Sequence, residues 1–259
     1  SLEDITNINM LHLQQKNHQP TILNRLYNIE NAFKLQKTFI ANVSHELKNP
    51  LTKISSQLEV SLLNERKIED YKQTIASVLE DTQDLAAITE SLLELNKISI
   101  SDYQASFSTL RIDEIMWESR SLTQKLNSAY KVIIDTQFMP DNEELLQIKG
   151  DEKLVLTALK NLIENGCKFS TNKKVHVSLQ IVKQTIEIKI KNEGKGIPEA
   201  DVPYIFQPFF RAENTAASKG YGIGLSLVER IVNLHQGSIS VESEQNGWTE
   251  FTVKFPIAI

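Results

Sequence analysis

Apolar residues recur at alternating steps of three and four along the first part of the chain. They stand at Ile22, Leu26, Ile29 and Phe33, and again at Ile40, Val43, Leu47, Ile54 and Leu58. This spacing is a heptad repeat, which is typical of a long amphipathic helix that packs against partner helices. The first 98 residues contain no glycine. The pattern therefore predicts long, continuous helical structure.

A second heptad repeat follows a short polar segment, Asn64 to Lys67. Its positions are Ile68, Tyr71, Ile75, Val78, Thr82, Leu85, Thr89 and Leu92. Two long amphipathic helices joined by a short break predict a helical hairpin. Because two helices alone bury too little apolar surface, we expect two copies to pair into a four-helix bundle, which makes the chain a homodimer.

The pattern changes after residue 100, where glycine and β-branched alternation appear. Strands are predicted at Lys131 to Gln137, Val175 to Val182, Thr185 to Lys191, Ser238 to Ser243 and Thr249 to Phe255. Helices are predicted at Ile112 to Ser128, Asp151 to Asn165 and Gly224 to Leu234, with Asp151 as an N-cap and Gly237 as a stop. The predicted fold class is α plus α/β, in which the dimeric hairpin is followed by an α/β sandwich with a mixed sheet and helices on one face.

Composition narrows the function classes. The chain has 259 residues, a net charge of -5 and one cysteine, Cys167. This balance does not suggest a nucleic-acid partner, and one cysteine excludes an intramolecular disulfide. No apolar run reaches the roughly 18 residues of a membrane span, so any membrane anchor is expected in a region absent from this chain.

The stretch FIANVSHELKNPL, residues 39–51, places reactive side chains on the first predicted helix. Val43 and Leu47 occupy heptad positions, so His45, two residues from each, is predicted to point outward. A solvated helix face that ends at Pro50 would give the same pattern. Pro50 also removes one helix hydrogen bond and could bend the helix just beyond His45.

Three further segments carry candidate chemistry. Asn161, Asn165 and Lys168 share one helix face, where amide oxygens could serve Mg²⁺ and an ammonium could reach a phosphate. The loop Asn192 to Ile197 follows a strand and carries glycines two apart. Gly220 to Leu225 opens a helix with alternating glycines, a pattern that can cradle phosphate. Between them, residues 201–219 resemble a lid whose aromatic residues would hold it down, with Arg211 placed to meet phosphate.

Together the segments SHELKNPL, NLIENGCKFS, NEGKGI, FQPFFR and GYGIGL, in this order, resemble the cytoplasmic catalytic core of bacterial sensor histidine kinases. The resemblance implies a dimerisation and phosphotransfer hairpin, then an ATP-binding domain of the type shared with gyrase and Hsp90. It places a signalling linker at residues 1–23, the hairpin at 24–98, an interdomain linker at 99–104 and the ATP-binding domain at 105–259. ATP and Mg²⁺ are the implied cofactors, and a response-regulator receiver domain is the implied partner.

The resemblance also assigns roles by position. His45 would be the phospho-acceptor, Glu46 its general base and Asn49 the residue that positions water for dephosphorylating the regulator. Asn165 and Asn161 would form the metal site. The implied ATP-binding residues are Asn161, Asn165, Lys168, Phe169, Asn192, Gly194, Gly196, Ile197, Phe209, Arg211, Gly220, Tyr221, Gly222, Ile223, Gly224, Leu225 and Thr249.

Two positions depart from the family pattern. Asn192 stands where aspartate is commonest in the family. Its amide oxygen can accept a hydrogen bond from the adenine amine, but without the added strength of a charged acceptor. We therefore expect lower nucleotide affinity and weaker discrimination for adenine. Gly166 replaces the usual alanine at a cost of about 1 kcal/mol in helix stability, and we expect it to allow close packing.

The resulting prediction is a protein-histidine kinase that autophosphorylates His45, passes the phosphoryl group to a regulator aspartate and also dephosphorylates the regulator. The implied location is the cytoplasmic portion of a bacterial inner-membrane protein. Three alternatives remain: a phosphatase-dominant member, a catalytically silent nucleotide-binding scaffold, and an ATP-driven clamp, which Asn161 disfavours because an amide cannot activate water.

Overall fold

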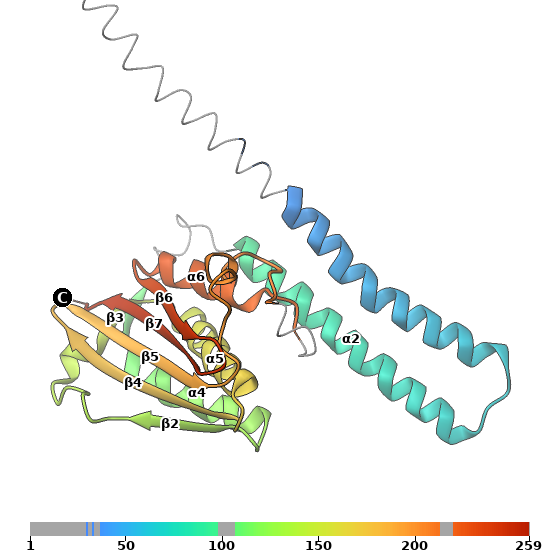
Figure 1. Cartoon of the computed structure of the whole chain (residues 1–259), viewed down its shortest axis with the longest axis horizontal. Helices are drawn as coiled ribbons and strands as arrows, with labels where there is room; N and C mark the ends of the chain where they lie inside the picture. The colour runs from blue at the N-terminus through green and yellow to red at the C-terminus, as the bar shows by residue number, and fades with distance from the viewer. Residues whose placement is uncertain (1–29, 31–32, 34–36, 98–106, 213–219, 259) are drawn as a thin grey trace, which may run out of the picture. The chain divides into compact units, whose positions relative to one another are not determined.

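The computed structural model describes residues 30, 33, 37–97, 107–212 and 220–258 (Figure 1). Two compact units make up the chain, Ser1–Asn64 and Glu65–Ile259. The predicted boundaries at 23/24 and at 99–104, and the lid residues 213–219, lie outside the described residues. Among the described residues, no helix is long and apolar enough to cross a membrane.

The first unit contributes one long helix, residues 37–63, which continues through Pro50. Val43, Leu47, Pro50 and Ile54 follow the heptad spacing and are partly buried, as are Asn42 and Glu46. Because proline has no N–H, the carbonyl of Glu46, four residues earlier, loses its helical donor. The predicted first helix is therefore confirmed over residues 37–63, whereas its heptad positions Ile22, Leu26 and Ile29 lie outside the described residues. The backbone beside His45 carries one missing hydrogen bond.

The second unit begins with the predicted second helix, α2 (Ile68–Lys97), whose first turn contains Glu69 and Asp70. Residues 107–258 then form an α/β domain in the order β1 (Ser108–Arg111), α4 (Ile112–Leu126), β2 (Lys131–Asp135), η2 (Glu143–Leu146), β3 (Gln147–Gly150), α5 (Glu152–Phe169), β4 (Lys174–Val182), β5 (Thr185–Glu193), η3 (Val202–Tyr204), α6 (Gly224–Leu234), β6 (Ser238–Glu244) and β7 (Trp248–Pro256). Two long helices followed by this α/β domain confirm the predicted fold class of the single chain, and the pairing of two copies stays a prediction.

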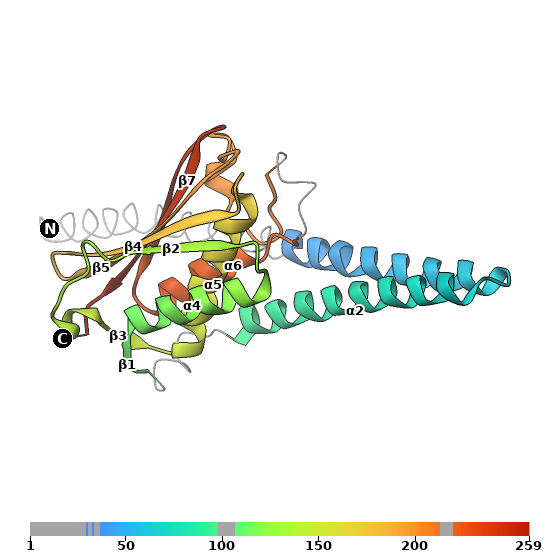
Figure 2. The same ribbon diagram turned by 90° about the horizontal axis from the view of Figure 1, so that it is seen from below.

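The main sheet has the order β2-β4-β5-β7-β6, in which β2 and β4 run parallel and the other neighbours antiparallel. The sheet is therefore mixed, as predicted. Helices α4, α5 and α6 lie on one face of it (Figure 2). The core between the two layers is apolar, and Val155, Ile163, Val177, Ile188, Val228 and Val253 within it are fully buried.

Several predicted boundaries shift for local reasons. Strand β2 ends at Asp135 because the Asp135 carboxylate accepts from the N–H of Gln137 and turns the chain. Helix α5 continues past Asn165 to Phe169. Glycine lets it do so, because a β-carbon on Gly166 would stand 2.6 Å from Cγ2 of Val175 on β4. The expectation of close packing at Gly166 is confirmed.

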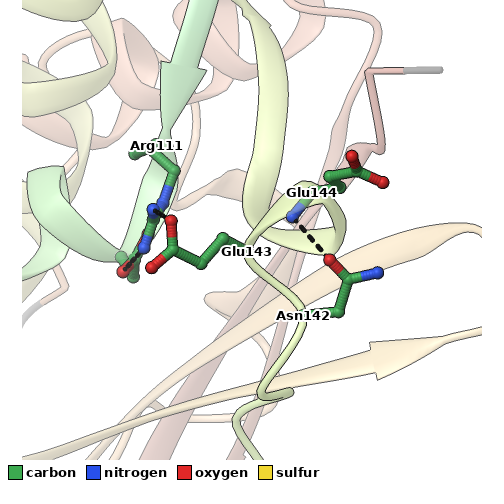
Figure 3. A network of polar contacts seen from close by, with 5 residues as sticks. Arg111, Asn142, Glu143 and Glu144 are labelled. Atoms are coloured by element: carbon green, nitrogen blue, oxygen red, sulfur yellow. Dashed lines mark hydrogen bonds and ion pairs between the residues drawn. The ribbon is translucent and has the colours of Figure 1, made fainter.

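A second sheet, which the sequence did not predict, forms where β1 pairs antiparallel with β3. Both strands have four residues, too few to show alternation. An ion-pair network holds this region (Figure 3): Arg111 donates from Nε and Nη2 to the two carboxylate oxygens of Asp113, at 2.9 and 2.8 Å, and from Nη1 to Glu143 in η2. The hydrogen bonds to Asp113 are the main reason why the pKa of Arg111 is raised. The network joins β1 and α4 to η2.

Buried His235 joins the C-terminus of α6 to the N-terminus of α5. Its Nδ1–H donates to the carbonyl of Ile231 at 2.7 Å, and its Nε2 accepts from the N–H of Asp151 at 3.0 Å. Phe107 stacks on the imidazole, with ring centroids 4.7 Å apart. Asp151 is the N-cap of α5, as predicted, since its side chain accepts from the N–H of Leu154. The residue with positive φ after α6 is Gln236 rather than Gly237, although the N–H of Gly237 caps the carbonyl of Val232.

We expect His235 to make stability depend on pH. Burial lowers the pKa of His235, so below pH 6.5, the ordinary value, the unfolded chain binds the proton more readily than the folded chain. The contribution of neutral His235 to the free energy of unfolding is therefore fully present above pH 6.5. It decreases as the pH falls, by up to about 1.4 kcal/mol per pH unit. Urea unfolding between pH 8 and 5 measures this slope. His235→Gln keeps an acceptor but does not titrate, so it should remove this part of the slope; an unchanged slope would contradict the assignment.

Candidate functional site

The α/β domain contains a cavity of about 320 Å³. The end of α5, the loops after α5 and β5, the described part of the lid, the glycine segment that follows the lid, and β7 surround it. Eleven of the predicted residues line the cavity: Asn165, Lys168, Phe169, Asn192, Gly196, Ile197, Arg211, Gly220, Gly222, Leu225 and Thr249. The three segments that the sequence singled out in this half of the chain therefore meet at one place.

Six predicted residues lie beside the lining rather than in it: Asn161, Gly194, Phe209, Tyr221, Ile223 and Gly224. Asn161 donates from Nδ2 to the carbonyl of Thr157, and its amide oxygen lies 2.9 Å from where a β-carbon of Gly224 would stand. Phe209 has φ +67 and stays outside the lining, which its neighbour Phe210 joins instead. These differences arise because a motif identifies a segment but not the direction in which each side chain points.

Seven lining residues were not predicted individually from the sequence: Ser170, Thr171, Lys195, Ile205, Phe210, Ala212 and Phe251. Ser170, Lys195, Phe210 and Ala212 adjoin predicted site residues and Thr171 is two residues from one, so a wider window around each motif would have included them. Phe251 carried no such signal. It lines the cavity because β7 pairs with β5, which places Phe251 opposite Ile190.

The last turn of α5 brings Asn165, Lys168 and Phe169 to the cavity. Nζ of Lys168 lies 5.0 Å from the centre of the Phe169 ring and beside Gly220. Desolvation, and then the nearby Arg211 guanidinium, lower the pKa of Lys168. Two like charges held close together at a half-buried place favour an anionic ligand, because an anion would offset both the desolvation and the repulsion.

Asn192 lies opposite Thr249 on neighbouring strands β5 and β7, and both side chains are buried at the cavity wall. The Asn192 side chain makes no hydrogen bond within the described residues, although only 6% of Asn192 is exposed. The amide atoms of Asn192 are not among the fully buried polar atoms that lack a partner, and Asn192 lines the cavity. The amide can therefore pair with a polar group of a ligand.

The Thr249 hydroxyl is oriented by a chain of hydrogen bonds. Ser243 Oγ accepts from the N–H of Ile197 at 2.9 Å and donates to the carbonyl of Trp248 at 2.8 Å. Because a hydroxyl has one proton, Thr249 must be the donor in its 2.9 Å contact with Ser243. Thr249 therefore offers only acceptor lone pairs to the cavity.

The glycine segment before α6 adopts backbone geometry that other residues disfavour. Gly222 has φ +70, and a β-carbon there would stand 2.5 Å from the carbonyl oxygen of Phe210. The N–H of Phe209 donates to the carbonyl of Gly222 at 2.8 Å. These contacts fix the end of the lid segment against the glycine loop.

Helix α6 begins at Gly224 without a side-chain cap. The first N–H groups of a helix have no partner inside it and carry a partial positive charge. Gly222 and Leu225, on either side of this helix start, both line the cavity. The arrangement suits phosphate oxygens.

Aromatic contacts anchor the described part of the lid, residues 201–212. The rings of Tyr204 and Phe210 are 5.9 Å apart, and Phe206 packs edge-on against Phe251, with centroids 6.5 Å apart. The prediction that aromatic residues hold this segment is thus confirmed for residues 204–210.

In the first unit, the side chain of His45 is exposed on the helix of residues 37–63, as predicted. Asn49 is exposed as well, and Glu46 is half-buried. The single cysteine, Cys167, is fully buried in the α/β domain. Burial raises the pKa of its thiol to about 11. The thiolate is therefore disfavoured at neutral pH.

Comparisons with known proteins agree with this arrangement. The family "His Kinase A (phospho-acceptor) domain" matches residues 35–99, and the family "Histidine kinase-, DNA gyrase B-, and HSP90-like ATPase" matches residues 150–259. The signal transduction histidine-protein kinase ArlS of Staphylococcus epidermidis is 30% identical over 237 residues, which are 90% of this chain and 51% of the relative. ArlS of Staphylococcus aureus (strain USA300) is 32% identical over 232 residues, which are 88% of this chain and 50% of that relative.

Solved structures share the fold. The histidine kinase AdeS of Acinetobacter baumannii superposes with a TM-score of 0.63 at 20% identity, covering 83% of this chain and 98% of that one. The histidine kinase ThkA, in complex with the response regulator protein TrrA, gives a TM-score of 0.66 at 22% identity, with coverages of 84% and 60%.

The chain thus combines a phospho-acceptor helix with an α/β domain of the ATPase type. It belongs to the sensor histidine kinases of two-component systems, of which it contains the catalytic core. It spans about half the length of the curated relatives it matches.

Proposed function

We propose that this chain binds Mg-ATP in the cavity of its α/β domain and transfers the γ-phosphoryl group to His45. The observation that carries the proposal is that one cavity gathers Lys168 and Arg211, an uncapped helix start and the unpaired amide of Asn192. A triphosphate would meet the cations and the helix N–H groups, and a base would meet the amide. The exposed His45, in the segment that matches the phospho-acceptor family, provides the nucleophile.

In the proposed step, a lone pair of the His45 imidazole attacks the γ-phosphorus, and the bond from phosphorus to the bridging oxygen breaks. ADP leaves with the electron pair of that bond, and Glu46 accepts the imidazole proton. Phosphoryl transfer requires mainly positioning and charge neutralisation, which Lys168 and Arg211 would contribute. The phosphoryl group then passes to an aspartate of a response-regulator receiver domain, and Asn49 would orient water when that transfer product is hydrolysed.

Asn165 is the side chain best placed to hold Mg²⁺. It lines the cavity, and its amide has no hydrogen-bond partner within the described ranges. Its oxygen suits a hard cation, which would neutralise phosphate charge there. Asn161 would contribute less directly, because it lies outside the lining. Among the residues that the structure describes, no group of three His, Cys, Asp or Glu side chains could hold a metal ion.

The test of this function is incubation with γ-³²P-labelled ATP and Mg²⁺. We expect labelled protein whose phosphate is lost in acid and retained in base, and we expect the label to move to a receiver domain when one is added. A silent scaffold would bind nucleotide without label, and a clamp would release labelled phosphate without labelled protein. A phosphatase-dominant member would label slowly but dephosphorylate a phosphorylated receiver domain.

We also propose that the chain forms a homodimer through its long helices. Apolar side chains such as Ile75 and Leu79 on α2 are 63% and 57% exposed, one helical turn apart. A second copy would cover such side chains in a four-helix bundle. We propose further that the natural protein is held at the bacterial inner membrane by a region outside this sequence, with this core on the cytoplasmic side.

Introducing charge at the exposed apolar pair is expected to dissociate the dimer. Ile75→Glu combined with Leu79→Glu removes two apolar contacts and should raise the dimer dissociation constant by about 100-fold or more. Light scattering coupled to size-exclusion chromatography measures the mass. Lys72→Glu, at an exposed polar position of the same helix, should leave the dimer intact. A wild-type chain that is monomeric at all concentrations, or an unchanged double variant, would contradict the proposal.

A further inference from the structure

We propose that Asn192 lets this cavity accept nucleoside triphosphates of both 6-aminopurines and 6-oxopurines, so that ITP binds nearly as well as ATP. The inference rests on the proposed function and extends it to the specificity of the site. It requires that the 6-position of the base face Asn192.

The first argument is the chemistry of the unpaired side chain. An amide carries an acceptor oxygen and a donor nitrogen. The pairing edge of adenine presents an amine donor and a ring-nitrogen acceptor, whereas that of hypoxanthine presents an oxo acceptor and a ring N–H donor. Asn192 can pair with either edge in two hydrogen bonds, because exchanging its oxygen and nitrogen exchanges the two patterns.

The second argument is that nothing within the described residues fixes the amide in one orientation. The Asn192 side chain has no hydrogen-bond partner there. Beside it lies Gly194, where a β-carbon would stand 3.3 Å from Nδ2. The terminal torsion of asparagine is broad and roughly two-fold, so both orientations are accessible at small cost.

The third argument is the rest of the cavity wall. The described lining contains no carboxylate, so none of those side chains places a negative charge against a 6-oxo group. Thr249 offers only lone pairs, as its contact with Ser243 requires. Each base edge includes one N–H group that can donate a hydrogen bond to the Thr249 hydroxyl oxygen. Strong rejection of an analogue requires a buried polar group that the analogue leaves unpaired, and neither base leaves Asn192 unpaired.

The experiment is isothermal titration of ATP and ITP, in the presence of Mg²⁺, into the wild-type chain, Asn192→Asp and Asn192→Leu. We expect wild-type dissociation constants for the two nucleotides to agree within about 3-fold. Asn192→Asp can only accept, so it should favour ATP over ITP by at least about 10-fold. Asn192→Leu should weaken both nucleotides without separating them. Asn142→Asp makes the same chemical change in an exposed turn outside the cavity lining and serves as the matched control.

A wild-type preference for ATP over ITP of 10-fold or more would overturn the inference while leaving ATP binding established. An Asn192→Asp variant with an unchanged ratio would overturn it as well, because Asn192 would then not contact the 6-position. If the wild-type chain binds neither nucleotide, the proposed function fails together with the inference.

Discussion

Replacing His45 with glutamine is expected to reduce the incorporation of phosphate from ATP to background. The substitution removes the proposed imidazole nucleophile, and the glutamine amide is not a nucleophile at neutral pH. Because His45 is exposed on its helix, the change should leave folding and nucleotide affinity unaltered. Autoradiography after acid and base treatment measures the label, and isothermal titration measures ATP binding.

Two further variants sharpen this test. His176→Gln removes another exposed imidazole, on β4, and should keep full labelling. Glu46→Gln keeps the nucleophile but removes the proposed base, so labelling should be slower by about 100- to 10,000-fold. Persistent acid-labile, base-stable label in His45→Gln would show that another nitrogen nucleophile, a histidine or a lysine, is the acceptor.

Replacing Lys168 with methionine is expected to weaken ATP binding by about 10- to 100-fold, because a hydrogen bond to a charged group contributes about 1.5–3 kcal/mol. The Lys168 ammonium is partly desolvated and lies near a second cation, Arg211. Such a pair is best stabilised when phosphate oxygens lie between the two charges. Methionine keeps an unbranched apolar stem of four heavy atoms but removes the ammonium, including its position over the Phe169 ring.

The affinity for adenosine distinguishes the loss of a phosphate contact from a general loss of folded structure. Lys168→Met should bind adenosine as the wild type does, because adenosine has no phosphate. Lys153→Met, in the exposed first turn of the same helix, should leave both affinities unchanged. Equal weakening of ATP and adenosine in Lys168→Met would refute a phosphate role for Lys168.

Much of the fold could be predicted from periodicity. Heptad spacing predicted helical structure through residues 37–63 and 68–97, and alternation located the five strands of the main sheet. The β1–β3 sheet could not be found in this way. Its two strands are short, lie more than 30 residues apart and pair through backbone groups that any sequence offers.

The candidate site was predictable as a set of segments rather than as a set of side chains. Lys168 reached the cavity because α5 continues through Gly166, whose close contact with Val175 no local pattern reveals. His235 illustrates the same limit. Nothing local to the end of α6 reveals that its Nε2 accepts from the N–H of Asp151, 84 residues earlier.

The sequence by itself determined the order of the two architectures, the exposure of His45 and the segments that would form the nucleotide site. These features follow from local spacing, because apolar periodicity decides which face of a helix or strand turns inward. Only the tertiary structure decided that Asn165 lines the cavity while Asn161 does not, that Phe210 replaces Phe209, and that Asn192 is buried without a partner. Those outcomes depend on how distant strands and loops pack, and above all on the β5–β7 register that places Asn192 opposite Thr249.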